Sequence, residues 1–131
     1  MRSCTEFKLV RVCKEDEGVS ICGAMSYNNT RSLLLMQQTG LMDSLNAIRA
    51  IGVDYQLPIC MMVGYQGKEP HLPPSESASY GVRIIEPVLD AMEIPYRLIE
   101  EPGDVEHIAA DIEQAYRDSS TFCFLIGRPP T

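Results

Sequence analysis

The chain has 131 residues, a formal net charge of −7 and a pI near 4.7, and its length suits one domain with a single core over residues 1–131. Hydrophobic residues make up 45% of the chain and charged residues 22%, a balance that excludes disordered and fibrous proteins. The acidic balance and the scattered lysines and arginines argue against nucleic-acid binding, and no apolar run reaches the roughly 18 residues that cross a bilayer.

The cysteines point to a reducing compartment. There are five of them, widely spaced and mostly set in apolar runs, so no disulfide framework or zinc pattern is visible. The first residues lack the apolar core of a signal peptide. We therefore expect reduced thiols, no metal ligands in this chain and a cytoplasmic protein.

Short β-rich runs alternate with helix-like stretches along the chain. Several of the β-rich runs are apolar at consecutive positions, which is typical of strands covered on both faces. The alternation predicts an α/β fold, a parallel sheet with helices on both faces, in which ligands bind beyond the carboxyl ends of the strands. The expected strands cover 7–12, 32–37, 58–65, 96–100 and 121–128, and the expected helices cover about 15–27, 41–55, 79–93 and 104–118.

The first expected helix, 15–27, begins with Glu15, Asp16 and Glu17 and carries no further charge. Carboxylates in a first helical turn face the positive end of the helix dipole, so capping is one explanation, and an acid placed to do chemistry is the other. The small residues that follow suit close packing against another element, and they suit a subunit interface equally well.

The expected strand 32–37 runs into the turn formed by Gln38, Thr39, Gly40 and Leu41. Such a strand–turn–helix connection places backbone amides and polar side chains at the carboxyl edge of a sheet. It lacks the glycine pattern of a dinucleotide site and the lysine of a phosphate-binding loop. Taken alone, the turn is therefore structural as readily as functional.

The longest irregular stretch is 64–77, in which two glycines and three prolines interrupt any regular pattern. It carries Tyr65, Gln66, Lys68 and His71. The lysine and the histidine are suited to an anionic substrate, but loops also carry such residues for solubility alone. A loop of this length is either a lid or binding segment, or a simple surface excursion.

Four segments in this order and spacing resemble the pyrimidine-binding domain of thiamine-diphosphate enzymes: EDEGVSICGAMSYNN, LLLMQQTGLMDSLNAI, LPICMMVGYQG and LDAMEIPYRLIE. The resemblance is nearest to the alpha subunit of sulfopyruvate decarboxylase and the matching region of phosphonopyruvate decarboxylase. It covers about residues 7–128 and implies a flavodoxin-like fold.

In that family a glutamate at the start of a helix, ten residues before an aromatic position, hydrogen-bonds N1′ of the cofactor's aminopyrimidine and favours its imino tautomer. Glu17 and Tyr27 have this spacing. The resemblance thus assigns the role to Glu17 and leaves capping to Glu15 and Asp16. The chemistry asks for a largely water-excluded carboxylate, and we expect the uncharged helix to provide that setting.

The resemblance assigns further residues to the cofactor and the substrate. Met42 departs from the pattern, because related chains commonly have a second glycine there. A second anionic group on the substrate would need cationic or amide donors, which Arg128, just beyond the last expected strand, is also suited to provide. The implied cofactor-binding residues are Gln38, Thr39, Gly40, Leu41 and Tyr65, and the implied substrate-binding residues are Gln66, Lys68 and His71.

The family's magnesium and diphosphate motif, Gly-Asp-Gly followed at a distance by paired asparagines, does not occur in this chain. The resemblance therefore implies that thiamine diphosphate is shared with a diphosphate-binding, beta-type subunit, which binds Mg²⁺. It also implies a hetero-oligomer with self-association through the pyrimidine-binding domain. Related domains begin with another strand and helix before the segment matching 7–12, and without them a central edge of the sheet is exposed.

We therefore predict the pyrimidine-binding subunit of a thiamine-diphosphate-dependent 2-oxoacid decarboxylase, acting on sulfopyruvate or phosphonopyruvate and active only with a partner chain. The alternative is a non-catalytic α/β binding or regulatory module that keeps the fold and has lost the cofactor. Met42 and the missing strand–helix unit would allow this alternative.

Overall fold

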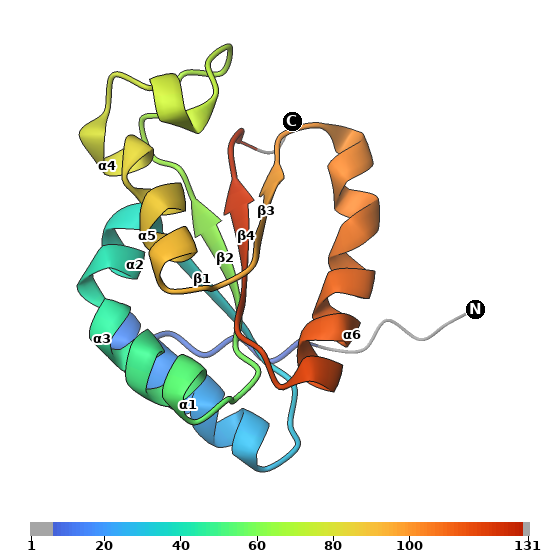
Figure 1. Ribbon diagram of the computed structural model, residues 1–131. Helices are drawn as coiled ribbons and strands as arrows, with labels where there is room; N and C mark the ends of the chain where they lie inside the picture. Colours follow the sequence, from blue (N-terminus) through green and yellow to red (C-terminus); the bar gives the residue numbers. More distant parts are fainter. Residues whose placement is uncertain (1–6, 130–131) are drawn as a thin grey trace.

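A computed structural model describes residues 7–129, which form a four-stranded parallel sheet flanked by helices (Figure 1). The spatial order of the strands is β1-β2-β4-β3, and all three pairings are parallel. The predicted α/β fold with a parallel sheet is confirmed. The strands are β1 (Leu33–Gln37), β2 (Cys60–Gly64), β3 (Tyr96–Ile99) and β4 (Phe122–Ile126).

The two central strands are apolar at nearly every position because both of their faces are covered. In β4, Cys123, Phe124 and Leu125 are completely buried, and in β2 Met61 and Val63 are as well. The edge strand β1 differs, since its buried and exposed positions alternate. One face of β1 therefore packs against the protein core, and the other is largely exposed to solvent.

The helices cover both faces of the sheet, as predicted. The chain moves across the sheet in one direction from β1 to β2 and on to β3, and then returns to β4. Right-handed connections therefore require α6 to lie on the face opposite α2 and α5, which is the arrangement in Figure 1. The helices are α1 (Glu15–Tyr27), α2 (Gln38–Asp43), α3 (Leu45–Ala47), the π-helix η1 (Ile48–Asp54), α4 (Tyr80–Arg83), α5 (Ile85–Ala91) and α6 (Ile108–Asp118), with 3₁₀ turns η2 (Pro74–Glu76) and η3 (Pro102–His107).

Two of the expected helices are divided into shorter pieces. The stretch 79–93 breaks between α4 and α5, because Pro87 has no N–H to donate to the carbonyl four residues earlier. The stretch 41–55 becomes α2, α3 and η1. No helix within residues 7–129 has the length and apolar character needed to cross a membrane.

The main hydrophobic core lies between the sheet and the helices α1, α2, η1 and α5. Its members come from every one of these elements, so the sheet and this helical layer are stabilised together. The fully buried side chains of this core include Val19, Leu41, Ile48, Met61, Val63, Ile85, Leu89 and Leu125.

The small residues of α1 serve close packing within the chain. A Cβ on Gly18 would lie 2.6 Å from Cδ1 of Leu34, and a Cβ on Gly23 would overlap Cγ2 of Ile51. The hydroxyl of Ser26 donates to the carbonyl of Pro58 at 2.5 Å. Of the two explanations that the sequence left open for these residues, internal packing is the one observed.

We expect Gly23→Ala to lower the free energy of unfolding by about 1–3 kcal/mol, because the added methyl group would force Ile51 to move within a packed layer. Urea denaturation measures the change. Gly103→Ala is the matched control, since a Cβ at Gly103 has no neighbour within 4 Å. Equal stability of the two variants would contradict close packing at Gly23.

The strand predicted over 7–12 is wrong. These residues have no regular secondary structure, and no hydrogen bond within the described chain joins them to the sheet. A strand requires a backbone neighbour, and the described residues supply none at this position. As a result β1 is an edge strand.

Candidate functional site

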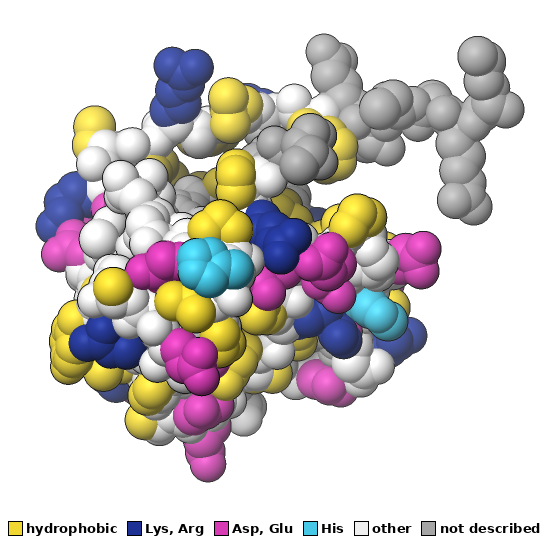
Figure 2. All heavy atoms as spheres, turned by 90° about the horizontal axis from the view of Figure 1, so that it is seen from above, with side chains coloured by type: hydrophobic (Ala, Val, Ile, Leu, Met, Phe, Trp, Pro, Cys, Tyr) yellow, Lys and Arg dark blue, Asp and Glu magenta, His cyan; other side chains and the backbone are white. Residues whose placement is uncertain are grey.

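Apart from Glu17 on α1, the residues predicted for the site lie at or after the ends of β1 and β2. α2 begins directly after β1, and Tyr65 follows β2 at once. Figure 2 looks down on this carboxyl edge and shows acidic and basic side chains interleaved around both of the chain's histidines. Hydrophobic side chains lie among them, so the edge is a mixed surface and not a single charged patch.

Glu15, and not Glu17, faces the turn after β1. The side chain of Glu15 lies against Gly40 so closely that a Cβ on residue 40 would be 2.5 Å from its Oε1. Glu15 is half-buried and Gly40 is buried. A Cβ at position 40 would require the Glu15 side chain to move, so the two residues are in close contact.

Glu17 lies elsewhere on the first turn of α1. Its side chain is exposed, and its Oε2 accepts a hydrogen bond from the backbone N–H of Cys13 at 3.3 Å. The enclosure predicted for Glu17 is not found in this chain, and its carboxylate is bonded to the backbone just before the helix start. Tyr27 is at the other end of α1, about 15 Å along the helix axis, so the structure does not bring this pair together.

The other turn residues divide between the surface and the core. Thr39 and Met42 are exposed, whereas the side chain of Leu41 is completely buried in the core. Contact with a ligand at this turn is therefore available from the side chains of Thr39 and Met42.

Gln38 connects the ends of β1 and β2. Its Nε2 donates to the carbonyl of Gln66 at 2.8 Å, and its Oε1 accepts the N–H of Gln66 at 2.8 Å. Gln38 is buried, so this reciprocal pair satisfies polar groups that have little access to water. Gln38 holds the loop after β2 in place, and the side chain of Gln66 remains exposed.

We expect Gln38→Ala to lower the free energy of unfolding by about 1–3 kcal/mol, because it leaves the N–H and carbonyl of Gln66 without partners. The adjacent Gln37 is exposed, so Gln37→Ala is the matched control and should change stability little. Urea denaturation measures both, and amide exchange at Gln66 should accelerate in Gln38→Ala alone. Unchanged exchange would show that the pair does not hold the loop.

Tyr65 is directed into the interior. Its side chain is buried and its hydroxyl has no partner within the described residues. Burial, followed by the nearby carboxylate of Glu86, raises the pKa of Tyr65. Tyr65 thus lies beneath the carboxyl edge and does not present its phenol to a ligand there.

Lys68 forms a buried ion pair between two strand ends. Its side chain is completely inaccessible, and Nζ lies 2.5 Å from Oε1 of Glu100, which follows β3. The side chain of Glu100 in turn occupies the space beside Gly127, at the end of β4. This pair links the loop after β2 to the residue after β3 across the end of β4, at the edge where ligands of such sheets often bind, and Lys68 is not a free cation.

The long loop after β2 is tied down at several further points. Glu69 accepts the N–H of Ala78 at 3.0 Å, and hydrogen bonds from Ser77 and from the backbone lower the pKa of Glu69. Arg128 pairs with Glu101 at 3.1 Å and donates to a carbonyl of the loop. His71 is exposed, and it is the one imidazole that the loop offers to solvent.

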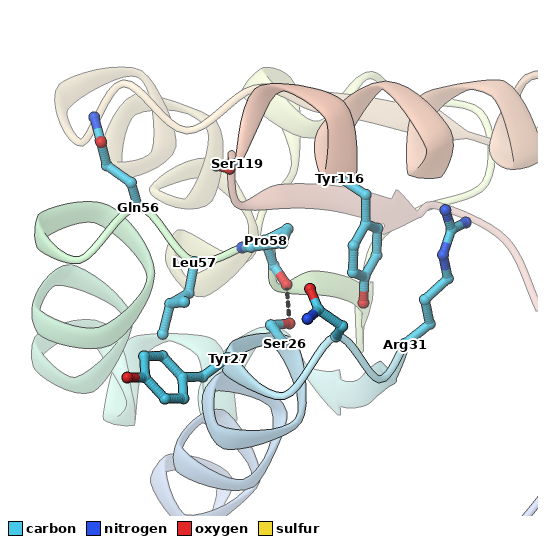
Figure 3. A pocket seen from close by; sticks show the side chains of 9 residues that line it. Ser26, Tyr27, Arg31, Gln56, Leu57, Pro58, Tyr116 and Ser119 are labelled. Atoms are coloured by element: carbon cyan, nitrogen blue, oxygen red, sulfur yellow. Dashed lines mark hydrogen bonds between the residues drawn. The ribbon is translucent and has the colours of Figure 1, made fainter.

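A separate hollow of about 380 Å³ lies at the opposite, amino end of the sheet (Figure 3). Its cation, Arg31, is already paired with Glu113 and lies 4.7 Å from the centroid of the Tyr116 ring. Of the residues predicted from the sequence, only Tyr27 reaches it. It is lined by Ser26, Tyr27, Asn29, Arg31, Gln56, Leu57, Pro58, Tyr116 and Ser119.

Two residues of the carboxyl edge were missed from the sequence. The sequence did offer Glu15 as a candidate, since it belongs to the same run of acids as Glu17. No sequence pattern pointed to Glu100, because its role depends on its ion pair with Lys68 from another part of the chain.

Several known proteins are similar to this chain in sequence. No model of a protein family matches the chain. Over 106 residues the chain is 27% identical to sulfopyruvate decarboxylase subunit alpha of Methanococcus maripaludis, a match that covers 80% of this chain and 62% of the relative. The chain resembles these alpha subunits.

Two further relatives bear the same name. The protein of Methanothermobacter thermautotrophicus is 26% identical over 103 residues, covering 79% of this chain and 61% of the relative. That of Methanocaldococcus jannaschii is 29% identical over 82 residues, covering 63% and 47%. The chain thus spans about three-fifths of the length of the first two relatives and about half of the third.

Proposed function

We propose that this chain is the pyrimidine-binding subunit of a thiamine-diphosphate-dependent 2-oxoacid decarboxylase. The observation that carries the proposal is the contact of the Glu15 carboxylate with Gly40, at the turn where a strand meets a helix on the carboxyl edge. Similarity to sulfopyruvate decarboxylase alpha subunits over about four-fifths of the chain supports it.

The residues of this edge fit the pyrimidine half of the cofactor and not the diphosphate half. The half-buried acid Glu15 lies against Gly40, and the preceding residue, Thr39, is exposed, which suits a hydrogen-bonding ring, whereas the cations Lys68 and Arg128 are already paired with glutamates. When bound, thiamine diphosphate supplies the electron sink that a 2-oxoacid needs in order to lose carbon dioxide. Mg²⁺ and the diphosphate would be held by a beta-type partner subunit.

Within this proposal, the acid that hydrogen-bonds the ring nitrogen is Glu15, although the spacing to Tyr27 predicts Glu17. Glu15 is half-buried at the turn, while Glu17 is exposed and bonded to Cys13. The part of Glu15 is to hold a proton at a carboxylate oxygen against the ring, and Gly40 and Thr39 position the ring beside it. A partner subunit covering the edge would exclude water from this contact and strengthen it.

The proposed substrate is a 2-oxoacid with a second anionic group, and the names of the relatives favour sulfopyruvate over phosphonopyruvate. Because Lys68 is enclosed, the predicted substrate-binding residues that remain exposed for that anion are His71 and Gln66.

The proposal is tested by mixing the full chain with a candidate diphosphate-binding partner, thiamine diphosphate and Mg²⁺, and measuring carbon dioxide release. Release is expected from sulfopyruvate, with lower rates from phosphonopyruvate and pyruvate, and none without the chain. No release from any 2-oxoacid, with both chains folded and associated, would overturn it.

One observation favours the alternative of a non-catalytic module. Met42 is 37% exposed at the turn where related chains commonly have glycine. If its side chain blocks the ring, the mixture binds no cofactor, and Met42→Gly restores binding. Failure of Met42→Gly to restore binding would remove Met42 as the cause.

A further inference from the structure

The hollow at the amino end of the sheet takes no part in the proposed function. Arg31 precedes β1, Pro58 precedes β2 and Ser119 precedes β4, so the length of the strands separates this hollow from the carboxyl edge. Its volume of about 380 Å³ is sufficient for a small organic molecule. A ligand bound here would therefore not touch the residues around Glu15 and Gly40.

The helices α1, η1 and α6 all end at this hollow. The carboxyl end of a helix carries a partial negative charge, and neither α1 nor η1 has a basic residue in its last turn to offset it. Helix α6 has Arg117 in its last turn, but its final residue is the acid Asp118. The helix ends therefore favour a cation in the hollow over an anion.

The residues that follow these helix ends contribute polar side chains to the hollow (Figure 3). They are Asn29, Gln56 and Ser119, whose φ angles are 57°, 52° and 51°, in the left-handed region where glycine is the usual residue. All three are exposed. Where glycine would be least strained, the chain instead offers side-chain oxygens that accept hydrogen bonds.

Arg31, the charged residue among those that line the hollow, is already paired. Two of its nitrogens donate to the carboxylate of Glu113, and its guanidinium lies 4.7 Å from the centroid of the Tyr116 ring. Arg31 is therefore not free to hold an anion. Its stacking also shows that the hollow accommodates a cation against an aromatic face.

The ring of Tyr27 is a second aromatic face of the hollow. Tyr27 is 79% exposed, and it lies on the other side of the Ser26–Pro58 hydrogen bond from Tyr116 (Figure 3). Within residues 7–129, the cations that stack on tyrosines are Arg31 on Tyr116 and one on a ring outside the hollow. The Tyr27 face is thus available to a cation from outside the chain.

We propose that this hollow binds a small organic amine in its ammonium form, seated against the Tyr27 ring and hydrogen-bonded to the side-chain oxygens of Asn29 and Gln56. The chain's net charge of −7 attracts such a cation. A metal ion suits the hollow less well, because no group of three His, Cys, Asp or Glu side chains in the described part of the chain could hold one.

Titration of the isotope-labelled full chain with putrescine at constant ionic strength, followed by amide chemical shifts, tests the proposal. We expect saturable shifts at residues 27–29, 56–57 and 119, and none at residues 38–41 on the carboxyl edge. 1,4-Butanediol is the ligand control, since it has the same carbon chain and carries no charge. It should give no saturable shift at these residues.

Variants of Tyr27 test the seat of the ammonium group. Tyr27→Leu removes the ring and should weaken putrescine binding about three- to tenfold, whereas Tyr27→Phe keeps the ring and should preserve the affinity. Tyr55→Leu is the matched control, because Tyr55 is 77% exposed next to the end of η1 and does not line the hollow. Shifts that do not saturate at the hollow, an equal response to the diol, or equal affinities of Tyr27→Leu and Tyr55→Leu would overturn the proposal.

Discussion

Glu15→Gln is expected to reduce carbon dioxide release by the reconstituted enzyme by about 10²–10⁴-fold, the usual effect of removing a positioned proton donor. Glutamine keeps the size of the side chain and its contact with Gly40, but it cannot hold a proton at a carboxylate oxygen. The loss should therefore appear in kcat with little change in the assembly of the subunits. Initial rates at saturating cofactor and substrate measure it.

Glu17→Gln is the matched control for this experiment. It makes the same change two residues away, in the same helical turn, at an exposed side chain that accepts a hydrogen bond from Cys13. We expect activity to stay within a few-fold of the unmodified chain. The opposite result, with Glu17→Gln inactive and Glu15→Gln active, would return the role to the residue that the sequence spacing predicts.

Glu100→Gln is expected to lower the free energy of unfolding by about 3–5 kcal/mol, because it leaves the Lys68 ammonium group buried without a counter-charge. Lys68→Met should cost less, since the Glu100 side chain is 22% exposed and keeps some contact with water. Urea denaturation of each variant at neutral pH gives the two values and their order.

The double variant Lys68→Met/Glu100→Met separates the buried charge from the loss of packing. An apolar pair of similar size removes the uncompensated charge, so its stability should approach that of the unmodified chain. If Glu100→Gln does not fold, the recovery of the double variant relative to Lys68→Met still reports on the pair. Single variants as stable as the unmodified chain would show that the ion pair does not hold these strand ends together.

The sequence was most informative where local pattern and burial agree. β2 and β4 are apolar at consecutive positions, and the sheet buries both of their faces. Helix α1 occupies the predicted span, with its three acids in the first turn. Residues 7–12 are also rich in β-forming residues, but pairing depends on a backbone neighbour that local sequence does not specify, so the prediction failed there.

At the candidate site, too, local sequence predicted the turn after β1 but not the contacts between residues far apart in the chain. The turn after β1 was located correctly at the carboxyl edge, because it follows from the order of strand and helix. The sequence alone could not decide which of Glu15 and Glu17 contacts Gly40. Residues two apart on a helix point to different sides, and only the position of α2 determines which of them lies against Gly40. The sequence predicts Lys68 as a substrate-binding or solubilising loop cation, yet its side chain is enclosed and paired with Glu100 from another strand end.

Titration calorimetry with thiamine diphosphate tests the central claim, that this chain provides one half of a shared cofactor site. With Mg²⁺ present, the account predicts negligible heat from this chain alone and saturable binding in the mixture with a diphosphate-binding partner, weakened by Glu15→Gln more than by Glu17→Gln. Full-strength binding by this chain alone, or a mixture that binds no better than the partner alone, would contradict it.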